Sequence, residues 1–174
     1  PGLTCGALTL SESKGLPDAF AQTARMAQDL GFGGVEIHAA HGCLLSQFLS
    51  PLFNQRGDAY GGDLKNRARL TFEVVEAVRG AVDPSFPVGI KLNTTDQLQG
   101  GFEEQEALEV IADLDRTGID LIDLSGGTYF PGAPSSSDRA GSGPYFVEFA
   151  KAARTRTQKP LMVTGGFKTY EQAE

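Results

Sequence analysis

The sequence predicts an α/β fold of the (β/α)8 TIM-barrel lineage, in the form of a partial barrel with about four parallel strands that alternate with helices. Short apolar runs alternate along the chain with longer segments of helical periodicity, which is the pattern of βα units and a parallel sheet. Polar residues gather at the carboxyl end of each predicted strand. The chain has 174 residues. A complete barrel needs roughly 250 residues, so eight full units do not fit.

The first half of the chain contains two predicted helices and two predicted strands. The first helix covers residues 16–30, where apolar side chains recur at helical spacing, and Gly31 ends it. A strand follows over residues 34–38, and a polar loop covers residues 50–63. The second helix covers residues 66–82. Pro84 and Pro87 mark the turn into a strand over residues 87–92.

The second half repeats this order. A helix is predicted over residues 102–117, a strand over 119–124, and a loop rich in Gly, Ser and Pro over 125–143. A helix over 145–155 and a strand over 160–164 come next. Thr169 is placed as the N-cap of a further helix over 169–174, with Gln172 three residues later as in a capping box.

The side-chain period of two favours a barrel over an open, doubly wound sheet. Each of three predicted strands has one mixed polar face, formed by Glu36 and His38, by Gly89, Lys91 and Asn93, and by Leu121, Asp123 and Ser125. In a barrel these faces point inward and rise to the carboxyl-terminal rim, where barrel enzymes keep their sites. In an open sheet helices pack on both faces, and burying the charges without partners is costly. A structural alternative stays open, in which the charges simply pair with one another.

The composition excludes several classes of partner. The net charge of −7 and the pI of about 4.8 argue against a nucleic-acid surface, which needs clustered Lys and Arg. No apolar run approaches 18 residues, so no membrane span is expected. No signal peptide is recognisable. Cys5 and Cys43 form no CxxC motif, which favours a reducing compartment, and we expect a cytoplasmic protein. Both ends of the sequence are expected to be cuts in a longer chain.

The only two histidines, His38 and His41, follow the first predicted strand. Residues three apart in a straight strand point to opposite faces, so the two imidazoles converge only if the chain turns at Ala39-Ala40. Two imidazoles at one rim can donate hydrogen bonds to a ligand oxygen and stabilise negative charge that develops on it. The alternative is one core histidine and one surface histidine.

A metal site is the second interpretation of this motif. His38, His41 and Cys43 are plausible zinc ligands, and Cys5 could join them. The spacing is neither H-E-x-x-H nor a CxxC pair, and no carboxylate lies close on the loop. We therefore expect no metal site, and a metal-dependent lyase or hydrolase remains the third functional hypothesis.

One long motif closely resembles the Old Yellow Enzyme family, also called the NADH:flavin oxidoreductase family. It comprises residues 31–42 (GFGGVEIHAAHG), 45–51 (LSQFLSP), 54–56 (NQR), 58 (D), 60–62 (YGG) and 66–69 (NRAR). Weaker resemblance extends through residues 91–93, 125–127 and 165–166. The resemblance implies that residues 1–174 form a single, incomplete FMN-binding barrel domain. It corresponds to about strands 4 to 7 of the family barrel.

The resemblance also implies an activity and a site. Family members bind FMN and, with NAD(P)H as reductant, transfer hydride to an activated C=C bond of a small enone-type substrate. His38 and His41 match the pair that binds the substrate oxygen, and His38 also contacts the flavin. Lys91 matches a basic position, usually Arg, that stabilises the anionic reduced flavin. Gly165 and Gly166 match the loop that binds the FMN phosphate.

The chain departs from the family at Cys43, where many members have a tyrosine that donates a proton to the substrate. A thiol is mostly protonated at neutral pH and can donate, so Cys43 is a candidate catalytic residue; inert packing is the alternative. We expect structural roles for the following loop, with caps and ion pairs formed by Arg56, Asp58, Tyr60, Asn66 and Arg67. Tyr129 and Phe130 are expected to line a substrate entrance or to cover the rim.

A non-catalytic hypothesis stands beside the enzyme. A partial barrel exposes the edges of its first and last strands, and exposed edges invite pairing with another chain. Such a chain is stable only as a homo-oligomer. Because segments that complete the family's flavin pocket are not in the sequence, we expect weak or absent FMN binding by these 174 residues.

Overall fold

Four parallel strands form one sheet in the order β1-β2-β3-β4. They are β1 (Val35–Ala39), β2 (Val88–Asn93), β3 (Leu121–Ser125) and β4 (Leu161–Val163). The computed structural model describes residues 6–128 and 144–173. Every strand lies beside its neighbour in sequence, without the reversal of order that a doubly wound sheet has. This order confirms the predicted barrel lineage.

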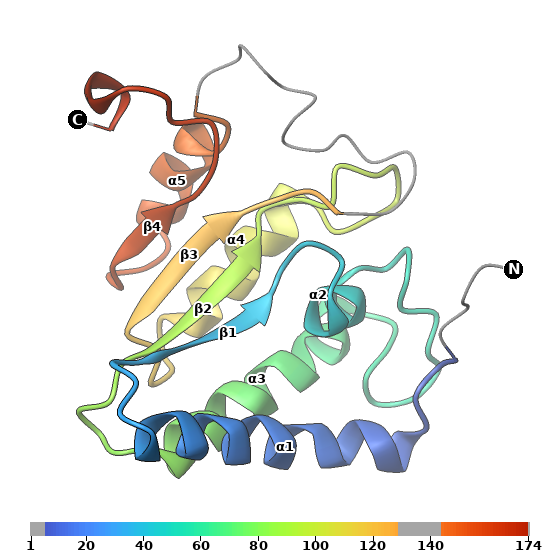
Figure 1. The fold of residues 1–174 in the computed structure, drawn as a ribbon. Helices are drawn as coiled ribbons and strands as arrows, with labels where there is room; N and C mark the ends of the chain where they lie inside the picture. The colour runs from blue at the N-terminus through green and yellow to red at the C-terminus, as the bar shows by residue number, and fades with distance from the viewer. Residues whose placement is uncertain (1–5, 129–143, 174) are drawn as a thin grey trace, which may run out of the picture.

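The helices cover one face of the sheet (Figure 1). They are α1 (Leu10–Asp29), α3 (Leu64–Ala81), α4 (Glu104–Leu114) and α5 (Val147–Arg154), while the short helix α2 (Leu44–Leu49) lies beyond the carboxyl end of β1. Parallel strands joined by right-handed crossovers place successive helices on the same side. Alternate strand residues, such as Ile37, Ile90 and Ile122, pack against these helices in the hydrophobic core. The other side chains point to what we call the open face of the sheet, which is the interior side of a barrel.

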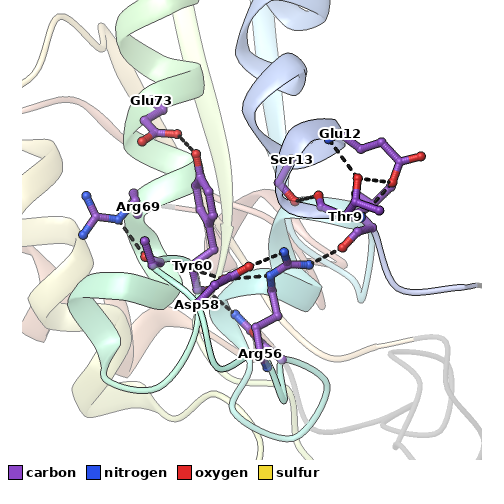
Figure 2. Close-up of polar contacts among 11 residues, drawn as sticks. Thr9, Glu12, Ser13, Arg56, Asp58, Tyr60, Arg69 and Glu73 are labelled. Carbon is purple, nitrogen blue, oxygen red and sulfur yellow. Dashed lines mark hydrogen bonds and ion pairs between the residues drawn. The ribbon is translucent and has the colours of Figure 1, made fainter.

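α1 begins six residues before the predicted start. Thr9 forms a capping box with Glu12: the Glu12 N–H donates to Thr9 Oγ1 at 3.2 Å, and the Thr9 N–H donates to Glu12 Oε2 at 2.7 Å (Figure 2). The apolar pattern that located the helix does not reach residues 10–15, because most of them are polar and exposed. Pro17 lies inside the helix rather than near its start.

Two other elements differ from the prediction. α2 was not predicted, because its six residues are too few to show a helical period. The predicted helix at residues 169–174 is a single 3-10 turn, Tyr170–Gln172. Thr169 makes no capping hydrogen bond with its side chain there. Instead, Gln172 Oε1 accepts from the Lys168 N–H at 2.7 Å, so the predicted capping box is wrong.

The loop before α3 is held by polar contacts, as the structural interpretation predicts (Figure 2). Arg56 makes two hydrogen bonds to Asp58, at 3.0 and 2.6 Å, and a third to the Leu8 carbonyl at 2.6 Å. Tyr60 Oη donates to Glu73 Oε2 at 2.7 Å. Burial and the Glu73 carboxylate raise the pKa of Tyr60 to about 12. These contacts connect the loop to the middle of α3 and to the segment that precedes α1.

α3 begins with Asp63 as its N-cap, whose Oδ1 accepts from the Asn66 N–H at 2.9 Å. Arg67 in its first turn is buried and bonds to Glu106 on α4 and to the carbonyl groups of Leu49 and Gly62. In the part of the chain that the structure describes, no helix is long and apolar enough to span a membrane.

Candidate functional site

A row of four side chains crosses the open face of the sheet. His38 on β1 is in register with Lys91 on β2, Lys91 with Asp123 on β3, and Asp123 with Met162 on β4. Residues in register on parallel strands point to the same face. The predicted placement of His38 and Lys91 on one face therefore holds.

Lys91 has two acidic neighbours in this row. Its Nζ contacts Asp123 Oδ2 directly and lies 3.8 Å from Glu36 Oε2. Asp123 is fully buried, and its other oxygen accepts a hydrogen bond from Thr164 Oγ1 at 2.7 Å. The charges thus face the interior side and also pair with one another, so the two interpretations left open by the sequence both describe the structure.

His38 and His41 lie together at the carboxyl end of β1. Their ring centroids are 5.2 Å apart, with the ring planes tilted by 50°. β1 ends at Ala39, and His41 adopts a positive φ of 61°, so the chain turns where convergence of the two rings requires it. The His41 backbone N–H donates to Asn93 Oδ1 at 2.9 Å, and His41 Nε2 lies 2.8 Å from Ser125 Oγ.

Both imidazoles are biased toward the neutral form. Burial lowers the pKa of His38 below 6.5, and the nearby Lys91 charge lowers it further, while Glu36 acts in the opposite direction. Burial also lowers the pKa of His41, with additional lowering by His38 and Lys91. A neutral imidazole has one N–H donor and one acceptor nitrogen. At neutral pH the pair can therefore donate to a ligand oxygen without carrying charge.

Cys43 lies two residues beyond His41, at the N-cap of α2. Its side chain is exposed and makes no capping hydrogen bond, so the thiol has no role in holding the helix. Among residues 6–128 and 144–173, no group of three His, Cys, Asp or Glu side chains is placed to hold a metal ion. Cys5, Tyr129 and Phe130 lie outside the described residues.

Gly165 and Gly166 follow β4, at the same carboxyl edge of the sheet. Both have positive φ angles, 120° and 79°, a region that favours glycine. A Cβ atom on Gly165 would lie 3.2 Å from the ring of Tyr145. The loop leads into the 3-10 turn rather than into an α-helix, so the predicted helix N-terminus after these glycines is absent from the described residues.

Three residues of this site had no predicted role. Asn93 and Ser125 contact His41, and Asp123 contacts Lys91. All three were placed on polar strand faces, and their position near the carboxyl ends of the strands was the available signal. Their contacts cross from one strand to another, which strand periodicity cannot reveal.

A parallel sheet in sequential order, helices on one face and polar residues at its carboxyl edge define the class of (β/α)-barrel enzymes. The family model described as "NADH:flavin oxidoreductase / NADH oxidase family" matches residues 4–174. The chain belongs to this family, as the resemblance predicted. Enzymes of the family are oxidoreductases that use FMN, with NAD(P)H as the reductant.

Individual relatives agree with this assignment. The chain is 41% identical to the NADH-dependent flavin oxidoreductase iliE of Neonectria sp. (strain DH2), over 96% of this chain and 23% of the relative. A solved structure of 2-naphthoyl-CoA reductase has a TM-score of 0.87 at 29% identity and covers 97% of this chain and 26% of that chain. Morphinone reductase in complex with tetrahydroNAD has a TM-score of 0.76 at 32% identity, over 97% and 43%. The chain thus spans less than half the length of each relative.

Proposed function

We propose that this chain carries part of the active site of an FMN-dependent oxidoreductase that reduces an activated C=C bond, an ene-reductase in fragment form. The observation that supports the proposal is that His38, His41 and Lys91 lie together near the carboxyl ends of β1 and β2. Two neutral imidazoles lie 5.2 Å apart, and the ammonium group is in register with the first of them. Donors of this kind fit an oxygen that gains negative charge during a reaction.

The donor set also fits FMN. Lys91 and His38 offer a cation and an N–H donor, which suit the oxygen and nitrogen atoms at the edge of a flavin ring. Gly165 and Gly166, which have no side chains, leave backbone N–H groups for the phosphate. Bound FMN would supply the two-electron redox chemistry. The role of the protein is to orient the ring and to stabilise charge beside it.

His38 and His41 act on the substrate in this proposal. Each donates an N–H to the carbonyl oxygen of an enone, which polarises the conjugated C=C bond and stabilises enolate-like charge on the oxygen. Because burial and Lys91 favour neutral rings, the pair acts by hydrogen bonding and not as acids. Cys43 is the proposed proton donor to the substrate carbon, with solvent as the alternative source.

The names of the structural relatives support a reductase of small organic molecules. Two of them are reductases of 2-naphthoyl-CoA and of morphinone. A panel of enones that differ only in the size of the attached group tests which compounds this protein reduces.

Ligand binding by the two histidines tests the proposal. A para-substituted phenol is titrated into the 15N-labelled chain, and the imidazole resonances are followed by NMR. We expect both histidines to shift, and we expect His38→Ala to weaken binding by roughly fivefold, the effect of one lost net hydrogen bond. Glu76→Gln on the outer surface of α3 is the matched control. Equal affinity of the wild type and His38→Ala would contradict the proposal.

A second candidate function is favoured by the sheet edges. Within residues 6–128 and 144–173, β1 and β4 each pair with one neighbouring strand, so each has one edge with no strand beside it. Beside β1 lies a groove of about 420 Å³, whose apolar lining includes Phe20, Val35, Ile37 and Val78. Two copies of four strands supply the eight strands of a closed barrel. In this alternative the chain is a non-catalytic half-barrel that is stable through self-association.

Analytical ultracentrifugation, which measures the mass in solution, tests whether the chain self-associates. If the chain forms a half-barrel dimer, we expect twice the mass of one chain at micromolar concentration. Met162→Lys on β4 should shift the equilibrium toward the monomer, because a lysine on an edge strand opposes pairing. Lys151→Met on the exposed surface of α5 is the control. A monomer that stays folded at high concentration would exclude this candidate.

A further inference from the structure

His41 is held in an uncommon conformation by residues from two other strands. Its φ of 61° is in the left-handed region, which few non-glycine residues adopt. Its backbone N–H donates to Asn93 Oδ1 at 2.9 Å, and its ring Nε2 lies 2.8 Å from Ser125 Oγ. Asn93 and Ser125 are register partners at the ends of β2 and β3. One cross-strand pair therefore contacts both the backbone and the ring of His41.

The orientation of the Asn93 amide is fixed by its other contacts. Asn93 is 1% exposed. Its Nδ2 donates to Asp96 Oδ1 and to the Gly127 carbonyl, both at 3.0 Å. With its amide nitrogen committed on that side, Oδ1 is directed toward the His41 N–H. A side chain of β2 thus holds the backbone of His41, which follows β1.

Ser125 acts on the imidazole ring itself. The two nitrogens of a neutral imidazole differ, because one carries the proton and the other accepts. A serine hydroxyl group can donate to Nε2, which leaves the proton on Nδ1, or it can accept from a protonated Nε2. Ser125 is 5% exposed, so water competes little for its hydroxyl group. The contact at Nε2 restrains the ring rotation, and donation by the Ser125 hydroxyl group would also hold the proton on Nδ1.

We propose that Ser125 is a positioning residue for His41, which holds the imidazole in one orientation and one tautomer while Asn93 holds its backbone. This inference rests on the proposed function in one respect: a ring that binds a ligand oxygen must present the same nitrogen each time. Ser125 itself does not touch the substrate. Its contribution is to keep the donor of His41 aligned with that of His38.

The tautomer of His41 can be measured directly in the full 174-residue chain. Only two histidines are present, so a long-range 1H–15N spectrum of the imidazoles contains two sets of signals. His38→Gln assigns them. At pH 8 we expect the Nδ1–H tautomer of His41 to dominate by about fivefold or more, the ratio to which a typical net hydrogen bond corresponds. In Ser125→Ala we expect a loss of most of this bias, with the His38 signals unchanged, and in Ser125→Thr its return.

Ser85→Ala, at an exposed turn, is the matched control and should leave both histidines unchanged. The proposal is overturned if the Nδ1–H tautomer of His41 does not dominate in the wild type, and this measurement depends on no variant. It is also overturned if Ser125→Ala keeps the bias. If the wild type shows a single His41 tautomer but does not bind the phenol, the result counts against the proposed function and not against the role of Ser125.

Discussion

Lys91 on β2 and Asp123 on β3 form an ion pair between register partners on the open face of the sheet. Asp123 is fully buried, and Glu36 lies 3.8 Å from the same ammonium group. The basic residue proposed to stabilise reduced flavin is therefore also the counter-ion of a buried carboxylate. The same ammonium group therefore has a structural contact and the proposed role beside the flavin.

Removing the ammonium group should destabilise the fold. Lys91→Met leaves Asp123 buried without its partner, and we expect a loss of about 3 kcal/mol in the free energy of unfolding, measured with urea. The double variant Lys91→Met/Asp123→Asn should recover part of this loss. Lys65→Met, at an exposed position of α3, is the control, and it should change the free energy of unfolding by no more than about 0.5 kcal/mol. Similar losses for Lys91→Met and Lys65→Met would show that the ion pair does not stabilise the fold.

The pKa of His38 should depend on the charge of Glu36. Glu36 raises the pKa of His38, and it also lies near Lys91, which lowers that pKa. Glu36→Gln should therefore lower the pKa of His38 further and leave that of His41 nearly unchanged. NMR titration of both imidazoles measures this, with Glu76→Gln as control. An upward shift of the His38 pKa would refute the electrostatic account.

The stability of the chain should fall in mild acid. The pKa values of His38 and His41 lie below the ordinary value of 6.5 in the folded state. Below pH 6.5 the unfolded chain therefore binds more protons than the folded chain, and the free energy of unfolding decreases as the pH drops from 6.5 toward the folded-state pKa values. Urea unfolding between pH 8 and pH 5 tests this. His38→Gln should flatten part of the slope, and an unchanged slope would assign it to other groups.

A single glycine in the loop before α3 should be sensitive to substitution. A Cβ atom at Gly61 would lie 2.1 Å from the Arg56 carbonyl oxygen, which forces the backbone apart. Gly61→Ala is expected to cost about 2 kcal/mol in the free energy of unfolding. Gly57→Ala, where no atom lies within 4 Å, is the matched control and should change stability little. A neutral Gly61→Ala would mean that the loop relaxes without cost.

The affinity of the chain for FMN should be low. The relatives compared here are more than twice its length, and the chain supplies only one part of the flavin contacts proposed above. We expect the purified chain to bind FMN weakly or not at all, as judged from its visible spectrum. A yellow protein with near-stoichiometric flavin absorbance would refute this expectation.

The sequence by itself determined the alternation of strands and helices, the parallel sheet and the family. These follow from local periodicity, from turn residues such as Gly31 and Pro84, and from one long motif around His38 and His41. It also located Lys91 on the correct face, because the side-chain period of a strand is strict.

Only the tertiary structure decided how the polar residues pair. The contacts of His41 with Asn93 and Ser125 span 52 and 84 residues of sequence, and the Lys91–Asp123 pair depends on the register between two strands. The short helix α2 and the exposed start of α1 also lacked a readable period. Strand register and the turn at His41 are set by packing and long-range hydrogen bonds, which act only after the chain has folded.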